Sequence, residues 1–269
     1  MKIVFVKTMK LTIYSLIFIL FNVNSCLSQA GKDSRIEINS IIDSVKCNNE
    51  KYYYEFPDIL SKNEINFFNN SMSTDYLNYL DLDIEKKNIR PSDIINMAIL
   101  MRKKECNDNN NYSGFIGSNY KVTFNNFKIV SINMNYESMA GSINIDSYYY
   151  NFDIEKNKIL QFNDIIKENK IYELLKKINS ILLDRLNKVN KENKDELNNS
   201  DVYESLIHSK SLFKKENLDT FSISEKGIEY IFNYGFPNCS IAIENNIFIS
   251  YNDLKMILKD DFKKKIGVY

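Results

Sequence analysis

The chain has 269 residues, of which 44% are apolar and 26% are charged, and 35 basic residues balance 35 acidic ones. An apolar fraction of this size supports a folded core and excludes a globally disordered chain. The balanced charge leaves no basic stripe for a nucleic acid, so that class of partner is not expected.

The first 30 residues have the pattern of a signal peptide. Three lysines precede the uncharged apolar run 11–23, which has the length of a signal-peptide core and is short for a membrane span. The run leads to Cys26 in a segment that resembles the bacterial lipobox, whose cysteine becomes lipidated. Cleavage near Ser28 or Ala30 is the alternative.

Loss of this leader removes lysines and no acidic residue, so the mature chain is mildly acidic. We expect an exported protein, located in the periplasm or held as a lipoprotein at the outer membrane or cell surface. Its contact with a membrane would then be limited to a lipid anchor at Cys26.

Three further cysteines are Cys47, Cys106 and Cys239, which are too far apart for a zinc knuckle or a closely spaced redox pair. In an oxidising compartment Cys47 and Cys106 can form a disulfide, because both lie in the N-terminal half and flank a helical region. Three buried or free thiols are the equally open alternative. The chain also lacks a glycine-rich phosphate loop, and we expect neither a metal nor a cofactor.

Residues 31–112 are expected to form a small N-terminal α+β module. Residues 36–42 suggest a strand or a short helix, and an aromatic strand that follows them is expected to end at Pro57. Helices are predicted to begin at a capping box at Ser61 and at Pro91. The asparagine-rich tract that closes this module is the clearest boundary in the chain.

Residues 113–269 are expected to form a C-terminal α+β domain, organised around three consecutive antiparallel strands within residues 119–160. Aromatic and β-branched residues alternate there with polar ones, and Asn and Gly mark the turns. A helix is expected to follow Asp164, its N-cap, and to carry an apolar stripe with a 3.6-residue period from Ile171 to Val189. The remaining expected elements are a short helix from Asp201, strands over 220–224, 228–234 and 240–249, and a last helix over 252–265. This order predicts an α+β fold in which helices cover an antiparallel sheet.

Residues 119–258 contain a series of short segments in a particular order. They are YKVTF (120–124), IVSI (129–132), YNFD (150–153), IL (159–160), DII (164–166), GIEYIF (227–232), YGFP (234–237) and ISYNDL (249–254). In this order they resemble the secreted domain of unknown function found in the extracellular half of RsiV-type anti-sigma factors and beside the deacetylase domain of PdaC-type enzymes. Residues 54–57 and the helix after them are similar to the companion N-terminal module of those proteins.

Two departures limit what this resemblance implies. The residues before the apolar run are too few for the cytoplasmic anti-sigma segment, and the single histidine, His208, does not suit the His-rich metal site of the deacetylase. The resemblance therefore implies the binding half of those systems alone. That half recognises lysozyme in RsiV-type proteins, so a protein or a cell-wall glycan is the expected ligand and no enzymatic activity is expected.

Tyrosine runs supply the candidate ligand-binding residues. Residues 52–54 and 148–150 are each three consecutive tyrosines, so each run places tyrosine on both faces of its strand. The outward residues, Tyr53 and Tyr149, have the amphipathic side chain favoured in protein and sugar contacts. Ordinary edge-strand positions filled by tyrosine are the alternative interpretation.

An envelope hydrolase is the alternative function. It would use paired carboxylates, as glycosidases do, and Asp153 with Asp164 is the candidate pair, with Glu155 nearby. The pattern favours turn and cap roles for these residues. His208 lies near the end of a short helix, where a surface or capping role is favoured over that of a catalytic base.

Overall fold

The structure, a computed structural model, describes most of the chain from residue 35 onward. The described residues are 35–47, 49–60, 67–82, 89–107, 113–192, 201–209, 211–236 and 243–268. The signal peptide expected over 1–30, with Cys26, lies outside these ranges, as do Ser61 and Cys239.

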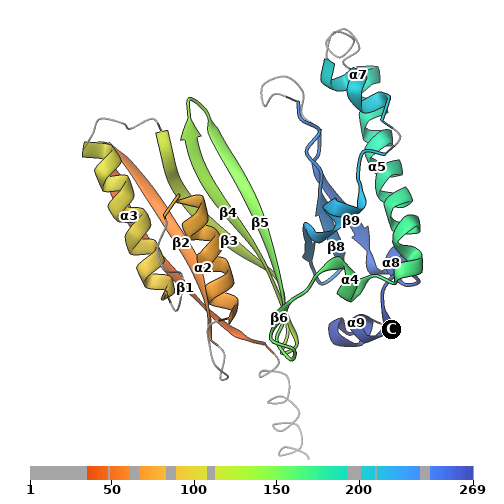
Figure 1. Ribbon diagram of the computed structural model, residues 1–269, viewed down its shortest axis with the longest axis horizontal. Helices are drawn as coiled ribbons and strands as arrows, with labels where there is room; N and C mark the ends of the chain where they lie inside the picture. The colour runs from red at the N-terminus through yellow and green to blue at the C-terminus, as the bar shows by residue number, and fades with distance from the viewer. Residues whose placement is uncertain are drawn as a thin grey trace, which may run out of the picture. The chain divides into compact units, whose positions relative to one another are not determined.

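The fold is α+β, as predicted, and its strands form two sheets (Figure 1). The first sheet has the order β1-β2-β3-β4-β5-β6 and the second the order β7-β8-β9. The strands are β1 (Glu37–Cys47), β2 (Glu50–Leu60), β3 (Ser113–Asn125), β4 (Ile129–Ala140), β5 (Ile143–Asp153), β6 (Lys158–Ile159), β7 (Phe221–Ile223), β8 (Gly227–Ile231) and β9 (Asn246–Ser250). The helices are α2 (Phe67–Tyr79), α3 (Pro91–Asn107), α4 (Phe162–Ile165), η1 (Glu168–Lys170), α5 (Ile171–Glu192), α7 (Asp201–Ile207), η2 (Lys215–Asp219), α8 (Tyr251–Leu254) and α9 (Asp260–Ile266).

The three strands predicted within residues 119–160 are confirmed as β3, β4 and β5, which pair in antiparallel fashion. Buried Ile132, Met134 and Tyr136 alternate along β4 with more polar residues that face the other way. Gly141 turns the chain from β4 to β5 with a φ of +79°, a conformation that costs a glycine little.

The strand expected to end at Pro57 continues to Leu60, which corrects that prediction. The N–H of Glu55 donates to the Oγ of Ser118 in β3, so the nitrogen of Pro57, two residues on, points to the same side. On that side β2 and β3 are paired only at Tyr54 and Ser118. Pro57 therefore removes no ladder hydrogen bond, which is the condition for proline within a strand.

The pairing of Tyr54 with Ser118 is parallel and makes the first sheet mixed. It joins strands from the two sides of residue 112, where the domain boundary was expected. Residues 37–269 form one compact unit, so that boundary separates two elements that share a sheet.

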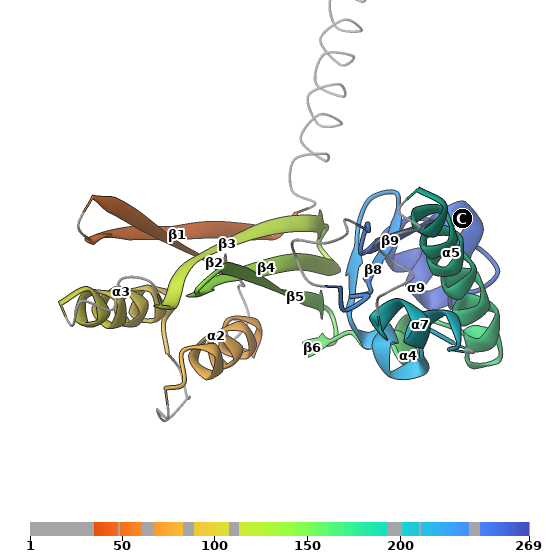
Figure 2. The ribbon, with the colours of Figure 1, turned by 90° about the horizontal axis from the view of Figure 1, so that it is seen from above.

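Helices α2 and α3 cover one face of the first sheet (Figure 2). Aromatic side chains fill the layer between α2 and the sheet. Tyr76 of α2 lies at the centre, with its ring centroid 5.5 Å from that of Phe56, 5.4 Å from that of Phe115 and 5.1 Å from that of Tyr136. The alternation of large aromatics in β2 to β5 thus forms this core.

A second core lies between the second sheet and α5. The buried stripe of α5 is Leu174, Ile178, Leu182 and Leu186, spaced by four residues as a helix requires. It belongs to one apolar cluster with residues of the second sheet, namely Ile228, Tyr230, Ile247 and Ile249.

An isolated antiparallel bridge between Ile166 and Leu258 changes two of the predicted helices. Asp164 lies within the short helix α4 and does not cap the long helix, which begins at Ile171 after one turn of 3₁₀-helix. The last helix, expected over 252–265, is divided into α8 and α9. In both places the backbone is extended at the bridge and cannot continue a helix.

Polar contacts join β7 to the first sheet. The Oγ of Ser131 donates to Asn151 (2.7 Å), and it accepts from Thr123 (2.9 Å) and from the N–H of Ile223 in β7 (3.1 Å). Asn151 in turn donates to the carbonyl oxygen of Phe221 over 2.7 Å. These buried hydrogen bonds satisfy the polar residues that alternate with the aromatics of β4 and β5.

Cys47 and Cys106 form a disulfide, which is the first of the two alternatives that the sequence left open. The bond joins the end of β1 to the end of α3, with the Cα atoms 5.7 Å apart. Nearby, the buried guanidinium of Arg102 lies 4.3 Å from the centroid of the Tyr52 ring.

None of the helices in the described ranges has the length and apolar character of a membrane span.

Candidate functional site

The candidate site lies on the face of β1–β5 that α2 and α3 leave uncovered, which we call the helix-free face. Tyr52 contacts Arg102 of α3, and Tyr54 packs on Phe115, so both point to the helix side. Tyr53 therefore points to the helix-free face, where its side chain is 55% exposed.

Tyr149 points to the same face. Its neighbours turn the other way, because Tyr148 packs against Tyr79 of α2 and Tyr150 donates to Asp75 of α2 over 2.8 Å. Tyr149 itself is half-buried. Burial, and secondarily the negative charge of Glu229 in β8, raise the pKa of Tyr149 to about 12. The outward tyrosine of this run is thus less exposed than expected.

The strand register separates these two tyrosines. Gly117 of β3 lies beside Tyr53 of β2, because a Cβ on Gly117 would lie 3.1 Å from the carbonyl oxygen of Tyr53. Across the next two strands, Gly117 is opposite Glu137 of β4, and Glu137 is opposite Ile145 of β5. Tyr149 lies two rows away, opposite Asn133. β2 and β5 are three strand spacings apart, about 14 Å. The two predicted residues share a face without touching.

Between the two tyrosines lies a row of polar side chains that the sequence analysis missed, which we call the amide ladder. Asn119 of β3 donates to Glu137 of β4 over 3.0 Å, Asn135 of β4 donates to Asn119 over 2.9 Å, and Ser147 of β5 donates to Asn135 over 2.7 Å. The signal was the run of residues 133–137, in which polar residues alternate with Met134 and Tyr136.

Exposed aliphatic residues flank the amide ladder. Ile42 pairs with Glu55 and is 61% exposed, and on β5 Ile143 is 57% and Ile145 is 62% exposed. The register places all three on the helix-free face. The centre of this surface is polar, and its flanks combine these aliphatic side chains with two charged groups, Glu55 opposite Ile42 and Lys51, whose Nζ lies 4.7 Å from the centroid of the Tyr53 ring.

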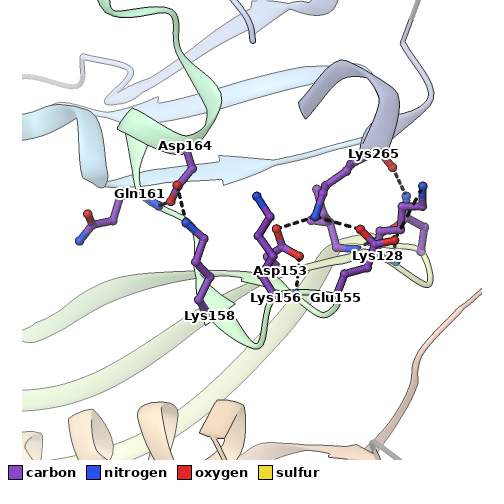
Figure 3. Close-up of polar contacts among 10 residues, drawn as sticks. Lys128, Asp153, Glu155, Lys156, Lys158, Gln161, Asp164 and Lys265 are labelled. Atoms are coloured by element: carbon purple, nitrogen blue, oxygen red, sulfur yellow. Dashed lines mark hydrogen bonds and ion pairs between the residues drawn. The ribbon is translucent and has the colours of Figure 1, made fainter. Parts of the chain in front are cut away.

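The carboxylates of the hydrolase alternative are bound to lysines (Figure 3). Asp153 is buried and accepts from Lys265 of α9 over 2.6 Å, and Glu155 lies 3.0 Å from the same Nζ. Asp164 accepts from Lys158 and from the N–H of Gln161.

Although burial opposes it, the contacts of Asp164 lower its pKa below the usual value, so this carboxyl is held in its charged form. Asp153 and Asp164 contact different lysines, and both neutralise positive charge at turns and helix ends. Such contacts are those of structural ion pairs.

His208 follows α7 and is exposed, and its Nε2 lies 3.3 Å from an oxygen of Glu204 one turn earlier. Both residues line a shallow hollow of about 640 Å³ with Ser209, Lys214 and Phe232. This placement agrees with the surface role favoured from the sequence. In the described ranges, no group of three or more His, Cys, Asp or Glu residues is arranged to hold a metal ion.

Comparison with known proteins gives likeness in structure only. No protein-family model and no curated protein matches the sequence. The chain is similar to the crystal structure of a DUF3298 family member from Bacteroides fragilis NCTC 9343, with a TM-score of 0.50 and 13% identity over 87% of this chain and 97% of that one. A DUF3298 family protein from Pseudomonas aeruginosa PAO1 has a TM-score of 0.49 and 11% identity over 86% of this chain and 98% of that one. The first of these likenesses shows a shared fold.

Proposed function

We propose that this protein is an exported, non-enzymatic binding or sensing module of the bacterial envelope, and that its ligand binds the helix-free face. The proposed ligand is a protein, lysozyme-like, or a cell-wall glycan. The observation that carries the proposal is Tyr53, a large amphipathic side chain that is 55% exposed beside the amide ladder. Exposed tyrosine contributes strongly to protein and sugar recognition when a ligand covers it.

Two further lines support an envelope role. The order of short segments resembles the extracellular domain of RsiV-type and PdaC-type proteins, and the fold is shared with a DUF3298 family structure. A disulfide between Cys47 and Cys106 suits an oxidising compartment outside the cytoplasm.

Retention of ligands from envelope fractions, and of purified lysozyme, tests the binding role. Tyr53→Ala is expected to weaken retention by about tenfold, since truncation of an interface aromatic typically costs more than 1 kcal/mol. Tyr172→Ala is the matched control, because Tyr172 is 80% exposed on α5, away from the helix-free face. Equal retention by both variants would place the ligand elsewhere.

Export and anchoring are tested separately. We expect the full-length protein to fractionate with the envelope, and Cys26→Ser to release it into the soluble exported fraction if Cys26 carries the lipid.

The enzymatic alternative is tested by incubating the mature protein with purified cell wall. Release of soluble products by the wild type, and not by Asp153→Asn, would contradict a non-enzymatic role.

A further inference from the structure

We infer that the amide ladder binds a neutral glycan that carries hydroxyl and acetamido groups. The inference rests on the proposed function and names the class of its ligand.

Each asparagine of the ladder keeps unused hydrogen-bonding capacity. An asparagine amide has two N–H donors and an oxygen with two lone pairs. Asn119 uses one donor on Glu137 and one lone pair for Asn135, and Asn135 uses one donor on Asn119 and one lone pair for Ser147. One donor and one acceptor remain on each amide, next to each other. A sugar hydroxyl both donates and accepts, so it matches such a pair.

The ladder is also held in place before any ligand binds. Three strands carry its side chains, and three hydrogen bonds fix their orientation across the sheet. Fixed side chains lose little conformational entropy on binding. This matters for glycans, because each hydrogen bond to a hydroxyl replaces one to water and gains little by itself.

Charge narrows the ligand class. Asn119, Asn135 and Ser147 are neutral, and the one charge in the ladder is the carboxylate of Glu137. A carboxylate repels phosphate or sulfate groups and accepts from hydroxyl or acetamido N–H groups. The ladder therefore suits a neutral sugar better than an anionic polymer.

The flanks supply apolar contact. Tyr53 and Ile145 lie at opposite ends of the row that contains Glu137, about 14 Å apart. The C–H faces of sugar rings pack on such side chains while their hydroxyls reach the polar row. A protein interface has the opposite pattern, an apolar centre with a polar rim, so the polar centre favours a glycan.

Titration of the mature protein with the β-1,4-linked tetramer of N-acetylglucosamine tests this inference, read by calorimetry and by amide shifts in NMR. Asn135→Ala is expected to weaken binding by about tenfold, because it breaks the ladder at its centre. Asn187→Ala is the matched control, since Asn187 is exposed on α5. Thermal unfolding of each variant shows whether it is folded. If Asn135→Ala does not fold, binding is measured instead with a second ladder variant, Ser147→Ala.

Wild-type binding that is lost on ladder substitution and kept in the control supports the inference. Lack of binding to the tetramer by the wild type, or equal binding by the ladder variants, overturns it. If the wild type ignores the tetramer but retains lysozyme or an envelope protein through Tyr53, the glycan inference fails and the proposed binding function stands. If neither class of ligand is retained, both fail.

Discussion

Lys265 donates to Asp153 over 2.6 Å, and this ion pair joins α9 to the end of β5. The Asp153 side chain is 3% exposed and that of Lys265 is 13% exposed, so water screens the pair weakly. Lys265→Met would leave a buried carboxylate without its cation, and we expect the free energy of unfolding to fall by about 3 kcal/mol. Urea denaturation measures this change. Lys264→Met, at an exposed position of the same helix, should be nearly neutral.

The same ion pair predicts a pH dependence. Burial disfavours the charged form of Lys265, but hydrogen bonds to Asp153 and Glu155 outweigh burial and raise its pKa. A raised pKa in the folded state stabilises the protein below the unfolded pKa of lysine, about 10.4, and this stabilisation is lost as pH rises through the folded pKa. The stability difference between wild type and Lys265→Met should therefore shrink above about pH 10.4. A difference that stays constant at high pH would argue against this ion pair.

The disulfide between Cys47 and Cys106 closes a loop with a sequence separation of 59. Loop-closure entropy predicts that its loss costs up to about 4 kcal/mol of stability. Thermal unfolding with and without dithiothreitol should show a large shift for the wild type. The double variant Cys47→Ser, Cys106→Ser should unfold at the lower temperature under both conditions, and a shift caused by reductant in this variant would mean that another disulfide contributes.

Tyr149 should titrate near the top of the tyrosine range, because burial and then Glu229 raise its pKa to about 12. We expect Glu229→Gln to lower this pKa while burial keeps it above about 10, the ordinary value. NMR of ring-labelled tyrosine, with the resonance assigned by Tyr149→Phe, follows the titration. Glu225→Gln in the exposed turn before β8 is the control and should leave the pKa of Tyr149 unchanged.

Gly227 permits the close approach of β8 and β9. A Cβ at this position would lie 2.2 Å from the carbonyl oxygen of Ile249 and 2.8 Å from the Phe248 ring, so Gly227→Ala must separate the two strands. We expect a loss of about 2 kcal/mol in stability by chemical denaturation. Gly141→Ala meets no atom within 4 Å and has only the strain of its positive φ, about 1 kcal/mol. A larger loss for Gly141→Ala would contradict this account.

Local patterns predicted most of the fold. The alternation in β3 to β5 and the four-residue spacing in α5 are properties of short segments, and those elements were predicted with the correct type. The errors at Asp164 and in the last helix have one cause, the bridge between Ile166 and Leu258, residues far apart in sequence. No local pattern reveals such a contact.

At the candidate site, too, local patterns predicted some features and long-range contacts determined the others. The alternation of side chains in β2 predicted that Tyr53 points outward, and it does. Burial raises the pKa of Tyr149, and the charge of Glu229, a residue of the other sheet, raises it further. The amide ladder depends on the register of three strands, which periodicity does not set.

The parallel pairing of Tyr54 with Ser118 also has a consequence for how the protein folds. Hairpin β1–β2 can form locally, but its place in the sheet requires a contact across α2 and α3, and contacts of high sequence separation slow folding. During synthesis this hairpin is made before β3, so its inner edge is at first without a partner strand. Until β3 pairs with it, this unpaired edge makes the nascent chain prone to aggregation and available for binding by chaperones.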